Sequence, residues 1–367
     1  MRVGDEITIA PAELVAGGAA LARIDGFPIF ATNVFPGDVA IVRLTEVKKG
    51  FARAELVRIV EPSAFRRAAP CPIAEECGGC DWTALRLDHQ LEAKKKILIE
   101  SLRRIGKIHE HPPIAIHGSP LNYRLRSRLH QQGDAIGFYA MGSHRVVPLV
   151  SECEVVGVET AKHPMPGVTW EIDGRLIRDG EITIRVDEFT YRVSASSFFQ
   201  VNRHLLSTLL RLVTADASRV KERRLAVDLY AGVGFFTLPL AQLFERVIAV
   251  EGADSVHDVG RASALPAGLK TGAQIEAARS AVEDFDIPSA DFIFLDPPRA
   301  GTRKSVVERI ARQAREMICY LSCDPVTFSR DASRLIASGW RHATLDLLDL
   351  FPNTHHVETL ASFERAR

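Results

Sequence analysis

The feature that most constrains the fold is an alternation of strand-like and helix-like segments from about residue 205 to the end of the chain. Helix-like patterns occupy 205–213, 235–244, 305–315 and 326–339, and residues 340–367 are expected to form strands. The apolar strand-like runs are LAVDLY (225–230), RVIAVE (246–251), ADFIFLDPP (290–298) and MICYLSC (317–323). Such alternation predicts a doubly wound, mostly parallel sheet with right-handed crossovers. Ligands of these sheets bind at the carboxyl ends of the strands, so we expect the chemistry there.

The first half of the chain has a different pattern. Residues 1–62 carry short strand-like runs separated by Gly, Pro and Asn, which is typical of a small OB-type β-barrel. Residues 63–195 mix helical and strand patterns. A chain of 367 residues is long enough for two or three domains. We therefore expect an α/β protein with an OB-like barrel at 1–62, a mixed α+β central domain at 63–195 and a Rossmann-like domain at 196–367.

Charge is balanced overall but unevenly placed. The 46 Lys and Arg equal the 46 Asp and Glu, which argues against a protein that coats nucleic acid through excess positive charge. Residues 86–128, however, hold ten Lys and Arg against four Asp and Glu, a net charge of +6. The pattern at 82–105 predicts a helix with a basic face, which is either a solvated face or an RNA-binding one. The run NYRLRSRLH predicts a strand with Arg124, Arg126 and Arg128 on one face, which suits phosphate binding.

No apolar run approaches the roughly 20 residues that a membrane span requires, and the N-terminus lacks the apolar stretch of a signal peptide. We expect a soluble, cytoplasmic monomer with no membrane partner.

The first strand of the alternating half leads into a glycine-containing loop. Asp228 and Tyr230 precede Gly232 and Gly234, and glycines here permit a tight turn and close approach of a ligand. The next strand ends about twenty residues on in Glu251, where an acid binds ribose hydroxyls in nucleotide sites. With LDPPR at 295–299, these residues resemble the motifs of class I S-adenosylmethionine methyltransferases that act on nucleobases. A nicotinamide-binding or unliganded Rossmann domain is the alternative.

Two residues near the C-terminus have the chemistry for covalent catalysis. Cys323 ends a strand and opens the next helix, where the helix dipole is expected to favour a thiolate, whereas Cys319 is expected in the core. Glu358 lies among apolar residues that are expected to raise its pKa, just after His355 and His356. A thiolate that adds to uracil C6 makes C5 nucleophilic, and a base must then remove the C5 proton. Cys323 and Glu358 are the candidates for these roles.

Four segments, DLYAGVGFFTLPLA, FLDPPRAG, LSCDP and HHVETLASF, resemble in this order the signature of the RNA uracil-5-methyltransferases. The block SSFFQVN at 196–202 resembles that family's segment before the catalytic core, and the first 60 residues resemble its TRAM domain. Phe235 departs from the pattern, because the family usually has a polar residue there. The resemblance implies S-adenosylmethionine as cofactor, Cys323 as nucleophile and Glu358 as base. It implies cofactor contacts from Gln200, Tyr230, Gly232, Glu251 and Asp296, with Glu283 on the adenine side.

Four cysteines form a further group. Cys71, Cys77 and Cys80 have the spacing C-x5-C-x2-C, and the distant Cys153 supplies a fourth ligand for zinc or an iron-sulfur cluster. Radical S-adenosylmethionine enzymes would require C-x3-C-x2-C, which is absent. The group resembles the 4Fe-4S site of the 23S rRNA uracil-5-methyltransferases, which implies a structural cluster and 23S rRNA as the partner. A tRNA enzyme of the family, a methyltransferase for another base, and an RNA-binding assembly protein with an inactive methyltransferase domain are the alternatives.

Overall fold

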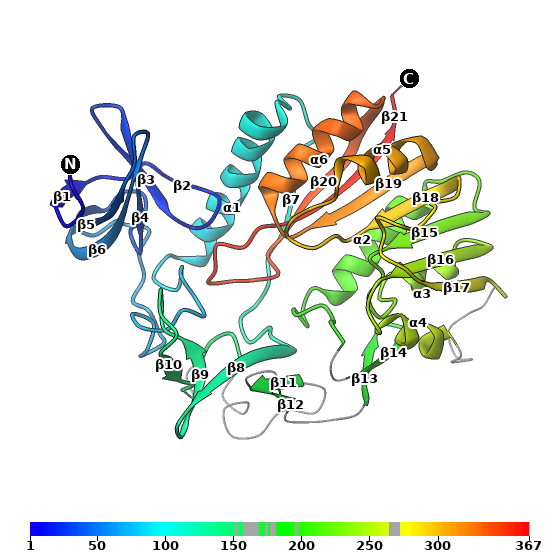
Figure 1. Cartoon of the computed structure of the whole chain (residues 1–367), viewed down its shortest axis with the longest axis horizontal. Coiled ribbons are helices and arrows are strands. Elements are labelled where there is room, and N and C mark those ends of the chain that lie inside the picture. Colours follow the sequence, from blue (N-terminus) through cyan, green and yellow to red (C-terminus); the bar gives the residue numbers. More distant parts are fainter. Residues whose placement is uncertain are drawn as a thin grey trace.

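The structure is a computed structural model that describes residues 1–150, 153–156, 169–172, 175–176, 181–194, 197–263 and 272–366. Ser196 of the SSFFQVN block, and with it the predicted boundary at 195/196, lies outside the described residues. Figure 1 shows an N-terminal sheet, a central part with a smaller sheet, and a large C-terminal sheet with helices on both faces. The predicted α/β fold class is confirmed.

The N-terminal part is a six-stranded sheet with the order β1-β5-β6-β4-β3-β2. Along β5, side chains alternate between buried and less buried positions, with Ala40, Val42 and Leu44 directed into the core. This period of two is the pattern of a sheet with one buried face, and the β-rich module is the one expected for an OB-like domain. The strands are β1 (Glu6–Ile9), β2 (Glu13–Leu14), β3 (Ala20–Ile24), β4 (Phe27–Thr32), β5 (Val39–Val47) and β6 (Ala52–Glu61).

The central part begins with a helix that is shorter than predicted. Helix α1 spans Leu87–Ser101 and continues as the π-helical turn η1 (Leu102–Gly106). Residues 82–86 are not helical, because Trp82 is buried and its Nε1 donates to the Gly18 carbonyl oxygen at 3.2 Å. The remaining elements form a five-stranded sheet, order β10-β9-β8-β11-β12, and a β13-β14 hairpin. They are β8 (Arg126–Gln132), β9 (Ala135–Tyr139), β10 (Val146–Pro148), β11 (Thr169–Ile172), β12 (Arg175–Leu176), β13 (Glu181–Val186) and β14 (Phe189–Ser194).

The predicted basic surface is smaller than the sequence suggested. Lys94 is fully buried and forms an ion pair with Asp349 at 2.5 Å. Strand β8 begins at Arg126, so Arg124 precedes the strand, and its Nε is buried. The side chain of Arg128 lies outside the described residues. Two of the ten bases therefore face the interior, which a charge count along the sequence does not reveal.

The C-terminal part is an eight-stranded sheet with the order β17-β16-β15-β18-β19-β21-β20-β7. The first five of these strands are parallel, and β21 lies antiparallel between β19 and β20. Strand β7 (Ala115–His117) comes from the central part of the chain and pairs with β20 at the edge. The strands are β15 (Leu225–Leu229), β16 (Arg246–Glu251), β17 (Gln274–Arg279), β18 (Ala290–Leu295), β19 (Ala314–Ser322), β20 (Trp340–Leu348) and β21 (Glu358–Arg365).

The helices of this part cover both faces of the sheet (Figure 1). They are α2 (Leu206–Ser218), α3 (Thr237–Ala241), α4 (Val256–Ser263), α5 (Lys304–Gln313) and α6 (Pro325–Ala337). Phe235 and Phe236 do not join α3 as the pattern predicted, because both are buried in a cluster of aromatic rings. The predicted helix at 235–244 is therefore only five residues long.

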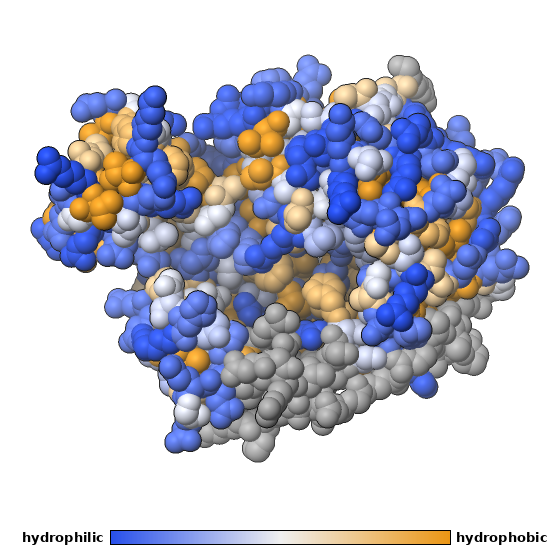
Figure 2. Space-filling view, viewed as in Figure 1, coloured by the Kyte–Doolittle hydropathy of each residue, from blue (hydrophilic) through white to orange (hydrophobic). Residues whose placement is uncertain are grey.

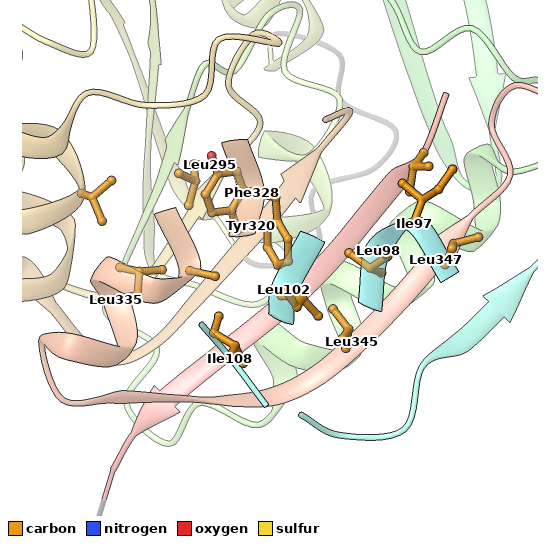
Figure 3. Packing of buried hydrophobic residues seen from close by; sticks show 14 of the residues in the cluster. Ile97, Leu98, Leu102, Ile108, Leu295, Tyr320, Phe328, Leu335, Leu345 and Leu347 are labelled. Carbon is orange, nitrogen blue, oxygen red and sulfur yellow. The ribbon is translucent and has the colours of Figure 1, made fainter. Parts of the chain in front are cut away.

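Helix α1 and its π-helical turn are part of the main core. Figure 3 shows Leu98 and Leu102 directed toward Leu345 and Leu347 of β20, and all four belong to one buried cluster. Burial of one such side chain contributes about 1.5–3 kcal/mol. Gly106 lets η1 approach α6, because a Cβ there would lie 2.7 Å from the Ser329 carbonyl oxygen. The central part is thus packed directly on the C-terminal sheet.

The surface is mostly hydrophilic in the view of Figure 2, with hydrophobic side chains gathered over the N-terminal part and near the centre. Phe198 is the most exposed of the large aromatic side chains among the described residues, at 61%. Across those same residues, no helix has both the length and the apolar character needed to cross a membrane.

Candidate active site

The predicted catalytic residues lie at one edge of the C-terminal sheet. Strands β18 and β19 are parallel and end near Asp296 and Cys323. Because β21 runs antiparallel to β19, its first residue, Glu358, lies at this same edge, and Thr359 pairs with Ser322. The reversal of one strand therefore joins residues that are 35 positions apart in the sequence.

The thiol of Cys323 is in an acidic environment. Burial, followed by the charges of Glu358 and Asp296, raises its pKa to about 12, and Arg299 acts in the opposite direction. The sequence-based expectation of a helix-stabilised thiolate is therefore wrong for the protein without ligands. The cause is the burial of the thiol together with the nearby charges of Glu358 and Asp296, whereas Asp324, the next residue, caps helix α6 by accepting from the Thr327 amide at 2.7 Å.

Glu358 has the raised pKa that its apolar neighbours predicted. Its side chain is 4% exposed, and burial raises its pKa well above the ordinary value. The negative charge of Asp296 acts in the same direction, and Arg299 opposes both. Cys323, Glu358 and Asp296 thus influence one another, and Arg299 is a fourth member of the group that the sequence did not single out.

Asp296 is linked to the block that precedes the C-terminal sheet. The Nε2 of Gln200 donates to Asp296 Oδ2 at 3.1 Å, and Gln200 is buried. Burial raises the pKa of Asp296 to about 7, while the hydrogen bond from Gln200 lowers it. The structure therefore joins two residues that the family resemblance assigns to the cofactor.

Glu251 and Gly232 also meet. The Gly232 amide donates to Glu251 Oε2 at 2.9 Å, and the Ala253 amide donates to Oε1 at 2.8 Å. Gly232 has a left-handed backbone with φ +56°, which a glycine adopts without strain. The carboxylate at the end of β16 is thus held against the loop that follows β15.

Tyr230 and Glu283 lie on the same side of this loop. The Tyr230 hydroxyl is 3.1 Å from Thr302 Oγ1, and its backbone is left-handed with φ +61°. Burial raises the pKa of Tyr230, and the charge of Glu283 adds to this effect, so the two side chains are close enough to interact. A non-glycine residue in this conformation is strained and is often found at ligand sites.

Asp228 is a site residue that the sequence-based assignment of contacts did not include. It is 1% exposed, Thr237 Oγ1 donates to its Oδ2 at 2.5 Å, and its Oδ1 is buried without a partner. Burial raises its pKa to about 7, and Asp296 and Glu251 add to this shift. The D-x-Y sequence could have indicated Asp228, because it lies two residues before Tyr230 at the carboxyl end of β15.

These carboxylates fit a cationic ligand. Burial raises the pKa of both Asp228 and Asp296 to about 7, the charges of Asp296 and Glu251 contribute to the shift of Asp228, and one oxygen of Asp228 has no partner. S-adenosylmethionine carries a positive sulfonium, and a bound cation favours the charged form of nearby carboxyl groups. Phe235 is not part of this set, since it is buried against Tyr191, Phe199 and Phe236.

The four predicted metal ligands surround one small cavity in the central part. Cys71, Cys77, Cys80 and Cys153 line it together with apolar side chains such as Phe138 and Val155. Burial, with smaller contributions from Cys153 and Cys77, raises the pKa of Cys80 to about 12, and Arg124 acts in the opposite direction. Over the described part of the chain, no three Cys, His, Asp or Glu side chains are arranged to hold a single metal ion.

The walls of this cavity suit an anionic group bound by thiolates. Four of the possible ligands in the lining are sulfur atoms, and the buried Nε of Arg124 has no hydrogen-bond partner. The guanidinium also lowers the pKa of Cys77, although burial, the main influence, raises it. A buried cation beside four thiols would offset negative charge there.

The strand order of the C-terminal sheet, with its antiparallel β21, is that of the class I S-adenosylmethionine-dependent methyltransferase fold. The chain belongs to the tRNA (uracil-5-)-methyltransferase family, whose model matches residues 172–286 and 275–366. This confirms the resemblance found in the sequence.

Relatives in bacteria match nearly the whole chain. The 23S rRNA (uracil(1939)-C(5))-methyltransferase RlmD of Pectobacterium atrosepticum is 29% identical, with 97% of this chain and 93% of the relative covered. The enzyme of the same name from Shewanella sediminis is 27% identical, with 99% and 97% covered. The tRNA (uracil-54, C5)-methyltransferase of Pyrococcus abyssi, solved with S-adenosyl-L-homocysteine, has the same fold, with a TM-score of 0.74 at 23% identity. That comparison covers 97% of this chain and all of the other.

Proposed function

We propose that this protein methylates C5 of a uridine in RNA, with Cys323 as the nucleophile and Glu358 as the base. The observation that carries the proposal is the meeting of these two side chains with Asp296 and Arg299 at one edge of the sheet. Cys323 follows β19 and Glu358 begins β21, and the carboxylate of Glu358 raises the pKa of Cys323. Such a pair supplies the two functions that C5 methylation requires.

The reaction needs both residues in sequence. The Sγ of Cys323 adds to C6 of the uracil ring, which makes C5 nucleophilic. Bound S-adenosylmethionine would supply the methyl group that bonds to C5, and its S–CH3 bond would break to leave neutral S-adenosylhomocysteine. Glu358 then removes the proton from C5, the C5–C6 double bond forms again, and the C6–S bond breaks so that Cys323 leaves. Asp296, which accepts a hydrogen bond from Gln200, lies close enough to both reacting residues to act on their pKa values.

The electrostatics of the site make the two residues inactive until the cofactor is bound. In the protein without ligands, burial and acidic neighbours raise the pKa of both Cys323 and Glu358, which favours the protonated form of each group. A cation near Asp228 and Asp296 offsets the negative charge that contributes to these shifts. Attack by Cys323 is therefore expected in the complex with S-adenosylmethionine and not in the free protein.

RNA that contains 5-fluorouracil tests the covalent step, because fluorine at C5 cannot be removed as a proton. With S-adenosylmethionine, the wild-type protein is expected to form a covalent adduct detected by mass spectrometry. Absence of an adduct, or an adduct that persists in Cys323→Ala, contradicts the proposal. With ordinary RNA, Glu358→Gln is expected to accumulate the methylated adduct, whereas a variant that forms no adduct contradicts the role of Glu358.

For the substrate, we propose a uridine of 23S rRNA in the cytoplasm, bound by the N-terminal and central domains. The names of the bacterial relatives and the four cysteines around one cavity support this choice. A tRNA substrate is the alternative, since the similar archaeal fold belongs to an enzyme named for tRNA. Mapping of 5-methyluridine in rRNA and tRNA from a strain that lacks this gene separates the two.

For the cysteine cavity, we propose a 4Fe-4S cluster held by Cys71, Cys77, Cys80 and Cys153, with zinc as the alternative. A cluster holds its cysteine sulfurs further apart than the tetrahedral shell of one ion, where each sulfur lies about 2.3 Å from zinc. The four thiols line one cavity, and their spacing resembles the 4Fe-4S site of the 23S rRNA enzymes, which supports the cluster. Iron and sulfide analysis of protein prepared without oxygen tests this, and a colourless protein with stoichiometric zinc contradicts it.

A further inference from the structure

Residues 349–357 connect β20 to β21 and lead directly into Glu358. Figure 1 shows this segment, in red, extending from the sheet toward the N-terminal and central parts. Asn353 is fully buried with a left-handed backbone, φ +66°, and Thr354 and Val357 are buried as well. A buried connection with a strained non-glycine residue requires fixed partners for its polar groups.

The first partner is Asp81, which immediately follows Cys80. Asp81 Oδ2 lies 2.7 Å from Nδ1 of His355, and Asp81 Oδ1 accepts from the His355 backbone amide at 3.1 Å. One carboxylate therefore holds both the ring and the main chain of His355. This fixes the residue three positions before Glu358 in place and in orientation.

The second partner is Glu154, which immediately follows Cys153. Glu154 Oε2 accepts from Nδ2 of Asn353 at 3.0 Å and from Arg67 at 3.0 Å. Arg67 also donates to Asn353 Oδ1 at 2.9 Å, and the Asn353 amide donates to Gln90 Oε1 at 2.8 Å. Asn353 itself lines the cavity of the four cysteines. Asp81 and Glu154, which both hydrogen-bond to the segment, are thus each adjacent in sequence to a cysteine of the cavity.

His356, the residue after His355, connects the segment to Arg299, which acts on Cys323 and Glu358. The ring of His356 lies beside that of His355, with centroids 4.4 Å apart, and its Nε2 is 3.2 Å from a terminal nitrogen of Arg299. The charge of Arg299 acts on both Cys323 and Glu358. A displacement of His355 would therefore move Arg299 and the start of β21 together.

We propose that Asp81 and Glu154 are positioning residues that, through His355 and Asn353, place Glu358 for removal of the C5 proton. The part of the chain around the cysteine cavity then fixes the position of Glu358, which carries out the last chemical step. This inference rests on the proposed function and deepens it. In that step the electron pair of the C5–H bond forms the C5–C6 double bond, Glu358 takes the proton, and sulfur leaves C6 with its electron pair. Formation of the adduct depends on Cys323, which follows β19 and is not part of this segment, so we expect it to be affected less than proton removal.

The test measures the two steps separately in Asp81→Asn, which keeps the shape of the side chain. RNA with tritium at uracil C5 is used in single-turnover reactions with S-adenosylmethionine. Adduct formation is followed on denaturing gels, and proton removal is followed as released tritium. We expect adduct formation close to the wild-type rate and tritium release slowed by about ten- to a hundredfold, since small misplacements of a reacting group have effects of this size. The adduct should accumulate accordingly.

Glu76→Gln is the matched control. Glu76 immediately precedes Cys77, but it is paired with the exposed side chain of Arg145 at 2.7 Å. Wild-type rates for both steps are expected in this variant, together with unchanged iron content in all variants. Glu154→Gln is expected to reproduce the defect of Asp81→Asn.

Three results would overturn the inference: equal slowing of both steps in Asp81→Asn, no change in either step, or the same selective defect in Glu76→Gln. If Asp81→Asn does not fold, His355→Gln is judged by the same criteria, since it removes the ring's contacts with Asp81 and His356 and keeps the backbone hydrogen bond to Asp81. Failure of the wild-type protein to form any adduct would count against the proposed function instead, because the positioning effect is measured relative to that adduct.

Discussion

Replacement of Asp228 by Asn should make the protein without ligands more stable at alkaline pH. Asp228 is 1% exposed, and burial raises its pKa from 3.8 to about 7. The folded state therefore keeps this proton over a range in which the unfolded state has lost it. Stability from this group is complete below about pH 4 and is lost as the pH rises through about 7.

The size of the effect follows from the two pKa values. They differ by about three, and one pKa unit corresponds to about 1.4 kcal/mol, so ionised Asp228 costs about 4 kcal/mol in the folded state above pH 7. Asn carries no charge, and its Oδ1 can still accept from Thr237 Oγ1. Relative to wild type, Asp228→Asn should gain up to about 4 kcal/mol near pH 9 and little near pH 4.

Urea denaturation of the ligand-free protein at several pH values measures this difference. Asp291→Asn is the matched control, because Asp291 is equally buried but accepts from the amides of Arg224 and Leu225 and pairs with Arg315. That variant should be less stable than wild type. A stability difference for Asp228→Asn that does not grow with pH would refute the reasoning, and so would a gain in Asp291→Asn of the same size.

Three further predictions concern the ligands and the core. Binding of S-adenosylmethionine should release protons below about pH 7, because a cation favours the ionised forms of Asp228 and Asp296; calorimetry in buffers of different ionisation enthalpy detects this, and binding without proton release contradicts it. Phe198→Ala should weaken RNA binding by about 1–3 kcal/mol, with unchanged cofactor affinity, if this 61% exposed ring stacks on a base; a gel-shift titration measures it, and equal RNA affinity argues against stacking. Lys94→Met should destabilise the fold by about 3–5 kcal/mol in urea denaturation, since it leaves Asp349 buried without its partner, and Lys94→Met with Asp349→Leu should recover most of this; a neutral single variant would contradict the role of the ion pair.

Much of the C-terminal sheet could be predicted because its central strands are buried on both faces. The expected strand 246–251 is identical to β16, and 225–230 differs from β15 by one residue. Continuous apolar runs mark such strands directly. Strand β7 gave no comparable signal, since a three-residue edge strand has no period to detect. Its place is decided by pairing with β20, which lies more than two hundred residues further along the chain.

The site shows the same division between local and long-range information. Gln200, Glu251 and Asp296 could be named from short motifs, and the structure places each beside another predicted residue or loop. The charge state of Cys323 could not be predicted from a motif. It depends on burial and on the charges of Glu358 and Asp296, which lie near the thiol only in the folded chain. The hydrogen bonds from the 349–357 segment to Asp81 and Glu154 could likewise not be predicted, since no sequence pattern connects residues so far apart.

The pairing of β7 with β20 has a consequence for how the protein forms during synthesis. Ala115 leaves the ribosome long before its partner Asp346, so the edge of the large sheet stays incomplete until almost the whole chain has been made. Contacts of such sequence separation are formed late and slowly. In that interval Leu98 and Leu102 lack the strand that covers them, and their exposed surface would be a binding site for chaperones. A chain that stops before residue 340 should therefore be retained in an aggregation-prone state, even though every residue of the N-terminal sheet is already present.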